Sequence, residues 1–308
     1  MSATMSKSWN QVKKNFVRHR SIFIMSLPVL IYYLIFYYGP MYGVIIAFKD
    51  FSPKLGIMGS KWIGFKHFTD FFSSYYFIRL IKNTLLLSFY SILWSFPAPI
   101  IFALLLNEVK HEKFKKGVQT ITYMPHFISL VVIVGLLKDF VVTDGLINDI
   151  IAFFGGERSN LLINPSLFRT LYISSGIWQS VGFGSIIYLA AISGISPELY
   201  EAAVIDGAGR WKQMLHITLP SIAPTIIILF ILQIGNLMNV GFEKVLLMYN
   251  DSILETADVI STFVYRKGLL EFNYSYSAAV GLFNSIINCI LLVVANVTSR
   301  KTSETSLW

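Results

Sequence analysis

The 308-residue sequence has little charge and a single cysteine. Only 14% of its residues are charged and 55% are hydrophobic, whereas about 25% are charged in an average soluble domain. Cys289 lies inside an apolar run, which excludes a disulfide framework and a thiolate metal site. The formal net charge is +8, but the basic residues are scattered in loops beside apolar runs. That distribution fits lipid headgroups and argues against a nucleic-acid partner.

Motifs for catalysis and for nucleotide binding are missing as well. The sequence has no Gly-x-x-x-x-Gly-Lys-Ser/Thr loop, and neither His-Glu-x-x-His nor Gly-x-Ser-x-Gly occurs. The five histidines are never paired at the spacing of metal ligands. We therefore expect no catalytic residue, no metal ligand and no cofactor bound by this chain.

Long apolar runs dominate what is present. A helix needs about 20 mostly apolar residues to cross a bilayer, and six runs of that kind predict an all-α, multi-pass membrane protein. The first run is too long for a signal peptide and is expected to stay as an anchor. The six predicted spans are 22–48, 83–107, 118–139, 171–195, 222–248 and 277–298.

The density of basic residues predicts the orientation. The segment KHEKFKK (110–116) holds four lysines, and basic residues such as Lys13, Lys14, Arg18 and Arg20 precede the first span. Short basic loops stay in the cytoplasm. We therefore predict a bacterial cytoplasmic-membrane protein with both termini inside. Its predicted parts are a cytoplasmic tail (1–21), an extracellular segment (49–82), a transmembrane core (83–298) and a second cytoplasmic tail (299–308).

One loop is polar and helical where the rest of the chain is apolar. Ser196-Pro197-Glu198 is typical of a capped helix start. Gly207 permits a sharp turn, and Pro220 is expected to end a second short helix before the fifth span. A helix lying on the membrane surface is one interpretation. The small and acidic residues of the loop favour a second one, in which it docks to a protein.

The loop carries a recognisable signature. Glu201-Ala202-Ala203, then Gly207, then Ile217-x-Leu219-Pro220 resembles, without a gap, the signature loop of type I ABC importer permeases. Segment 83–107 resembles the first scaffold helix of that family. Segment 258–283 resembles its branch for complex oligosaccharides and polysaccharide fragments.

The resemblance implies a fold and a set of partners. It implies the type I ABC importer permease fold of six helices, with loop 196–220 as a coupling helix that seats on a separate cytoplasmic ATPase. Two ATPase subunits would bind the ATP and Mg²⁺, a second and different permease chain would form a heterodimer, and a lipid-anchored or periplasmic binding protein would deliver a sugar. The implied coupling residues are Glu201, Ala202, Ala203, Asp206, Gly207, Ile217, Leu219 and Pro220.

Polar side chains inside the predicted spans have two interpretations. They could form hydrogen bonds between helices, or they could line a path in which amides bind sugar hydroxyls and aromatic rings stack on sugar faces. The best candidates for such a path are Trp178, Gln179, Tyr188, Asn236 and Asn239. No charged side chain is expected deep in a span, which argues against an ion-coupled site.

Three alternatives remain beside the sugar permease. A permease of the same class could carry a non-sugar solute. A secondary transporter would show internal repeats or buried acids, and a membrane enzyme acting on cell-wall sugars would need an acid cluster or a metal motif.

Segments 140–170 and 249–276 are expected outside the cell, and the apolar pattern of 144–156 predicts a short helix lying on the bundle.

Overall fold

The computed structural model describes residues 18–303 and 305–308, and Lys13 and Lys14 lie outside that part. The chain divides after Lys66 into two compact units, which are described separately. Almost all of the regular structure is helical in both.

The described part of the first unit is one long helix followed by a small hairpin. Helix α2 (Arg20–Tyr33), a π-turn (Leu34–Tyr38), α3 (Gly39–Met41) and a 3₁₀ turn (Tyr42–Phe48) run without interruption over 29 residues. Strand β1 (Lys49–Asp50) pairs antiparallel with β2 (Lys61–Trp62), and α4 (Gly56–Gly59) lies between them. The predicted span 22–48 is therefore confirmed as a helix, while the sequence did not predict the hairpin.

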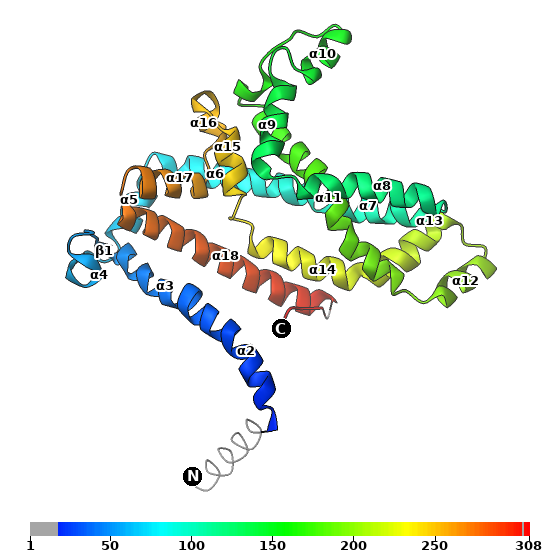
Figure 1. Ribbon diagram of the computed structural model, residues 1–308, viewed down its shortest axis with the longest axis horizontal. Coiled ribbons are helices and arrows are strands. Elements are labelled where there is room, and N and C mark those ends of the chain that lie inside the picture. The colour runs from blue at the N-terminus through cyan, green and yellow to red at the C-terminus, as the bar shows by residue number, and fades with distance from the viewer. Residues whose placement is uncertain (1–17, 304) are drawn as a thin grey trace. The chain divides into compact units, whose positions relative to one another are not determined.

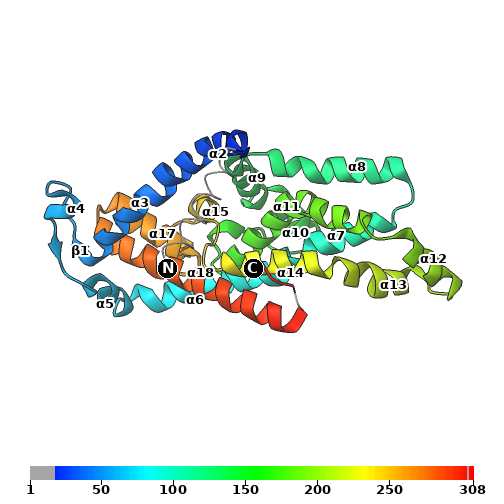
Figure 2. The same ribbon diagram turned by 90° about the horizontal axis from the view of Figure 1, so that it is seen from below.

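The second unit is built from helices alone among its described residues. Figures 1 and 2 show the long ones running side by side, α7 along α11 and α14 along α18. In chain order the helices are α5 (Lys66–Phe72), α6 (Tyr76–Tyr90), α7 (Pro97–Glu108), α8 (Glu112–Tyr123), α9 (Leu130–Val141), α10 (Leu146–Phe153), α11 (Phe168–Ser193), α12 (Pro197–Ile205), α13 (Arg210–Gln213), α14 (Leu219–Gly235), α15 (Phe242–Met248), α16 (Leu254–Ala257), α17 (Ile260–Tyr265) and α18 (Tyr274–Ser303).

Short π-helical and 3₁₀ turns join several of these helices. The π-turns cover Ser91–Ser95, Met214–Thr218 and Arg266–Leu270, and the 3₁₀ turns cover Met124–Phe127, Leu161–Ile163 and Asp251–Ile253. In the described part of the chain, five continuous helices are long and apolar enough to cross a membrane. They are Arg20–Phe48, Tyr76–Glu108, Phe168–Ser193, Arg210–Gly235 and Tyr274–Thr302.

The prediction of one helix over 118–139 is wrong. The chain there forms α8, a 3₁₀ turn and α9, with Ile128 and Ser129 extended between them. Pro125 restricts the residue before it and cannot donate a helical hydrogen bond. Ser129 then starts α9 afresh, because its hydroxyl accepts a hydrogen bond from the backbone N–H of Val132.

The fifth span is also displaced from its predicted position. The expected break at Pro220 is absent from the described chain: α13 continues through a π-turn into α14. Pro220 is in the first turn of α14, where the wider preceding turn (Leu219 N–H to Met214 O) leaves room for its ring. The predicted helix 222–248 ends instead at Gly235, and α15 is a separate short helix.

Two apolar clusters fix the helices around the space described below. Ala103, Tyr188, Ile192 and Ile222 belong to a buried cluster that joins α7, α11 and α14. A second cluster joins α6, α9, α11 and α15 to the segment after α15; its buried members are Leu87, Val134, Phe168, Val240, Val245, Met248, Ile253, Ala257 and Val259.

Candidate functional site

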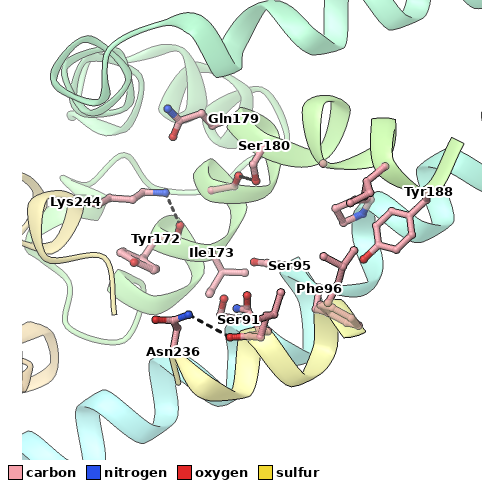
Figure 3. Close-up of a pocket in the computed structure, with 17 residues that line it drawn as sticks. Ser91, Ser95, Phe96, Tyr172, Ile173, Gln179, Ser180, Tyr188, Asn236 and Lys244 are labelled. Carbon is pink, nitrogen blue, oxygen red and sulfur yellow. Dashed lines mark hydrogen bonds between the residues drawn. The ribbon is translucent and has the colours of Figure 1, made fainter. Parts of the chain in front are cut away.

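A cavity of about 590 Å³ lies between the long helices of the second unit. The end of α6 with its π-turn, α7, α11, α14 and α15 each contribute to its wall (Figure 3). The residues lining it are Ser91, Ser95, Phe96, Pro99, Tyr172, Ile173, Gly176, Gln179, Ser180, Gly184, Ile187, Tyr188, Leu229, Leu232, Gln233, Asn236 and Lys244.

The lining combines neutral hydrogen-bonding groups with aromatic rings. Serine hydroxyls and the amides of Gln179, Gln233 and Asn236 both donate and accept hydrogen bonds. The rings of Phe96, Tyr172 and Tyr188 supply flat apolar surfaces of the kind that ligand pockets commonly use. Such a wall can exchange hydrogen bonds with a hydroxyl-rich solute.

Three of the five predicted path residues line this cavity: Gln179, Tyr188 and Asn236. Asn239 lines a neighbouring cavity of about 220 Å³, which shares Asn236 and other wall residues with the first. Trp178 lines neither. It is about half exposed and faces a different cavity, between α9 and α11.

Some polar side chains in the predicted spans bond to other segments instead. The amide of Asn284 on α18 donates to Asn239 Oδ1 at 2.9 Å. The side-chain oxygen of Asn288 accepts from the backbone N–H of Met238 at 2.9 Å. Interhelical hydrogen bonding is therefore found for the α18 amides, which hold the segment after α14. The amides of α11 and α14 line the cavity, and a role for them in a path stays a prediction.

The sequence analysis missed Lys244, which is buried at the cavity wall. It is 7% exposed, and its ammonium donates to the backbone oxygen of Tyr172 at 2.8 Å (Figure 3). Its number falls near the end of the predicted span 222–248, but α15 is separate from the five long helices. Burial lowers the pKa of the Lys244 amine to about 8.

A buried ionic cluster lies in the segment between α14 and α18. Asp258 is fully buried and pairs with Arg266 at 2.6 Å and with Arg79 of α6 at 3.4 Å. Thr262 donates to the same carboxylate at 2.9 Å, and the amide of Asn83 donates to the Asp258 backbone oxygen at 3.0 Å. Burial alone would lower the pKa of Arg266, but its hydrogen bond to Asp258 and the carboxylate charge raise it. We call Asp258, Arg79, Arg266, Thr262 and Asn83 the Asp258 cluster.

Loop 196–220 forms the predicted pair of short helices with a turn between them. Gly207 ends α12 with a φ of +75°, which favours glycine. Its N–H donates to Val204 O at 3.0 Å, and the N–H of Ala208 donates to Ala203 O at 2.8 Å. These two bonds form the Schellman motif, a common helix ending.

Side-chain hydrogen bonds join the second half of the loop to its turn and to α12. The side-chain amide of Gln213 donates to Ala208 O at 2.7 Å. The hydroxyls of Tyr200 and Thr218 lie 2.9 Å apart, and Thr218 is buried. The predicted cap at Ser196 is wrong, because in the described chain its side chain makes no capping bond to α12.

The surface of the loop is more apolar than the sequence analysis assumed. Glu201, Ala202 and Asp206 are exposed and Ala203 is partly buried. Large apolar side chains lie beside them on the surface, with Ile205 86% and Trp211 70% exposed. The remaining signature residues sit where the loop meets the bundle: Ile217 and Leu219 are partly buried and Pro220 is exposed.

The predicted helix in 144–156 is found as α10, but it packs differently. Its buried Asn148 donates to Val142 O at 2.8 Å and to Ser159 O at 2.7 Å, which holds α10 against its own loop. In Figure 1 the hairpin containing α10 projects upward, away from the long helices. Phe153 and Phe154 are more than 80% exposed, so α10 does not bury its apolar face on the bundle as expected.

Long apolar helices around a polar cavity, with an exposed helical loop between two of them, define the class of the protein: a multi-pass membrane transport protein. The family follows from comparison. Residues 73–303 match the family described as binding-protein-dependent transport system inner membrane component, and the chain belongs to that family.

Relatives and solved structures resemble nearly the whole chain. The polygalacturonan/rhamnogalacturonan transport system permease protein YteP of Bacillus subtilis is 47% identical, over 95% of this chain and 91% of its own length. Protein LplB of the same organism is 44% identical, over 100% of this chain and 96% of its own. A chain from a bacterial ABC transporter that imports the acidic polysaccharide alginate is 45% identical, with a TM-score of 0.88, over 95% of this chain and 99% of that one.

A second structure of an alginate ABC transporter, in complex with a periplasmic protein that carries an alginate pentasaccharide, is 44% identical with a TM-score of 0.89. It covers 96% of this chain and 99% of that chain. These likenesses establish that the chain has the fold of an ABC importer permease. The chain is a transport permease.

Proposed function

We propose that this permease carries an oligosaccharide or a polysaccharide fragment across the membrane through the cavity between α7, α11 and α14. The observation that carries the proposal is the lining of that cavity: amides and hydroxyls beside aromatic rings, which match the hydroxyls and the apolar faces of sugars. The relatives that are named for polysaccharides and alginate support it. Gln179, Tyr188 and Asn236 are the path residues, and Asn239 serves the adjoining cavity.

We infer that ATP is hydrolysed on separate subunits. The sequence has no phosphate loop, and loop 196–220 presents an exposed face on which an ATPase subunit can dock. Within it, Ala202 and Ala203 would meet the ATPase closely, Glu201 and Asp206 would contact its polar rim, and Gly207 would set the angle between the two short helices. Ile217, Leu219 and Pro220 would join the loop to the fifth span.

The remaining partners follow from the same importer architecture. A second permease chain would complete the path, and an external binding protein would deliver the sugar, as the periplasmic protein does in the alginate transporter complex. Both termini and loop 196–220 would be cytoplasmic. A non-sugar solute is the alternative cargo, but the amide-rich wall of the cavity favours a sugar.

The test is sugar uptake by cells that express this chain together with the second permease, the ATPase and the binding protein encoded by neighbouring genes. We expect labelled oligosaccharide uptake that requires ATP and is lost when Gln233 and Asn236 are both replaced by leucine, because the path then loses its central amides. A matched control is Ile290→Leu, an exposed apolar residue on α18 outside the cavity. Uptake of amino acids or peptides in place of sugars would contradict the proposal.

A further inference from the structure

The cavity holds a charge that a path for neutral sugars does not need. Of the described residues that line it, Lys244 alone is charged. Its ammonium lies beside α11, where a Cβ at Gly176 would come within 3.2 Å of Nζ. The long side chain therefore reaches across to α11, and its ammonium lies against the face of the helix at Gly176.

The bonds that this ammonium makes do not use its full capacity. A lysine ammonium has three N–H donors, and one of them donates to Tyr172 O at 2.8 Å. The ammonium also lies 4.8 Å from the centre of the Tyr172 ring, a cation–π contact. Among the described residues, ion pairs within 4 Å are made by Arg79, Arg158, Arg266 and Lys267, and none by Lys244.

A structural role alone does not account for a lysine here. The Tyr172 carbonyl lies inside α11, where helical hydrogen bonding already supplies it with a backbone donor. A neutral side chain such as glutamine could donate to it without a buried charge, and burying an unpaired ammonium costs free energy. The two N–H groups left over can donate to an acceptor in the cavity, and an acceptor of opposite charge would also balance the ammonium.

We propose that Lys244 binds a carboxylate of the sugar in this cavity, so that the permease prefers an oligosaccharide built from uronic acids to its neutral counterpart. The proposal rests on the proposed function and adds the chemical class of the sugar. Charge-assisted hydrogen bonds from an ammonium to a carboxylate are among the strongest that side chains make. The wall has no carboxylate among its described lining residues, so none repels the acid or competes for Lys244.

The neutral residues of the wall and Lys244 would bind different groups of the sugar. Gln179, Ser180 and Gln233 can bind hydroxyls, which acidic and neutral sugars share, so these residues do not discriminate between them. Only the ammonium does. A transport path must also release its solute, so the contact with the carboxylate cannot be very tight. A single hydrogen bond to a charged group corresponds to a preference of about tenfold for the acidic sugar.

The experiment uses the complete importer in proteoliposomes, with one binding protein throughout. The probes are trigalacturonate, its methyl ester and the neutral trisaccharide galactotriose, and the readout is the ratio of acidic to neutral uptake. Because every variant receives sugar from the same binding protein, the selectivity of that protein cancels when the ratios are compared. The variants are Lys244→Gln, Lys244→Arg and, as a matched control, the exposed α6 lysine in Lys82→Gln.

We expect the acidic-to-neutral ratio to fall about tenfold in Lys244→Gln and to stay within about twofold of the wild type in the other two variants. Equal loss of both probes in Lys244→Gln, or an unchanged ratio, would overturn the role of Lys244 and leave the proposed function standing.

If Lys244→Gln does not assemble, Gly176→Ala tests the same point more mildly, since its Cβ would lie 3.2 Å from Nζ and crowd the ammonium, which should lower the ratio. An unchanged ratio in an assembled Gly176→Ala importer would count against the proposal. Uptake of none of the three probes by the wild type would overturn the proposed function itself, which separates the two failures.

Discussion

Two segments that connect long helices in the second unit are built in opposite ways. Residues 236–273, between α14 and α18, hold much of the core: Val245, Met248, Ile253 and Phe263 are at most 1% exposed, and the Asp258 cluster ties the segment to α6. Its last residues are more open, with Leu269, Leu270 and Phe272 more than half exposed. Loop 196–220, between α11 and α14, has Thr218 as the one buried residue of its described length.

The contrast separates self-contained structure from surface left for other molecules. In 236–273 the buried carboxylate of Asp258 finds its partners within the chain, because an unpaired buried charge is costly. Lys244, whose ammonium makes no ion pair among the described residues, is the exception. In loop 196–220 the apolar side chains of Ile205 and Trp211 have no cover from this chain. Exposed apolar surface on a compact projecting element is typical of a docking site. Four predictions test the comparison.

The largest effect is expected inside the packed segment. Asp258→Asn should destabilise the protein by about 3–5 kcal/mol, because two arginines lose the buried charge that compensates them. Thermal unfolding in detergent measures the change. Asp149→Asn, which breaks the exposed pair with Arg158, is the control and should cost less than about 1 kcal/mol. Equal effects of the two substitutions would remove the distinction between buried and exposed segments.

The next effect is expected at the turn of the exposed loop. Gly207→Pro should lower uptake by about a hundredfold, because proline cannot adopt a φ of +75° and removes the N–H that bonds Val204 O. Protein yield and copurification of the second permease chain should remain. Gly207→Ala, which has open space around its Cβ, should cost only about 1–2 kcal/mol of backbone strain. Loss of Gly207→Pro from the membrane would mean that the loop supports the bundle.

A smaller effect is expected where the loop meets the ATPase. Ala203→Trp should overfill the contact, at a typical cost of about 1–3 kcal/mol, which is roughly a five- to hundredfold loss of ATPase affinity. Retention of the ATPase during purification measures it. Glu201→Gln removes one exposed charge, so the complex should stay together with weaker coupling. An Ala203→Trp importer with full ATPase content and full uptake would contradict docking at this face.

The smallest effect is expected from ATP itself. The purified single chain, without partner subunits, should hydrolyse ATP no faster than a protein-free control, because its sequence has no phosphate loop. A phosphate-release assay with and without Mg²⁺ measures this. Turnover above the control would overturn the assignment of ATP hydrolysis to other subunits.

The sequence correctly predicted features that depend on residues close together along the chain. The helix over 22–48 was expected from its apolar run and is found as Arg20–Phe48. The turn at Gly207 was expected from its composition and is found with a positive φ. Local composition was not sufficient at 118–139, where Pro125 and Ser129 divide an apolar run, or at Pro220, where a π-turn absorbs the proline.

By itself, therefore, the sequence determined that the chain is a multi-pass membrane permease with a signature loop, because hydropathy, small-residue spacing and missing motifs are properties of contiguous residues. Only the tertiary structure decided which polar groups face the cavity. Gln179 and Trp178 are adjacent in sequence but line different cavities, and Lys244 meets Tyr172 across 72 residues. Which way a side chain points depends on how distant helices pack, and no local pattern encodes that.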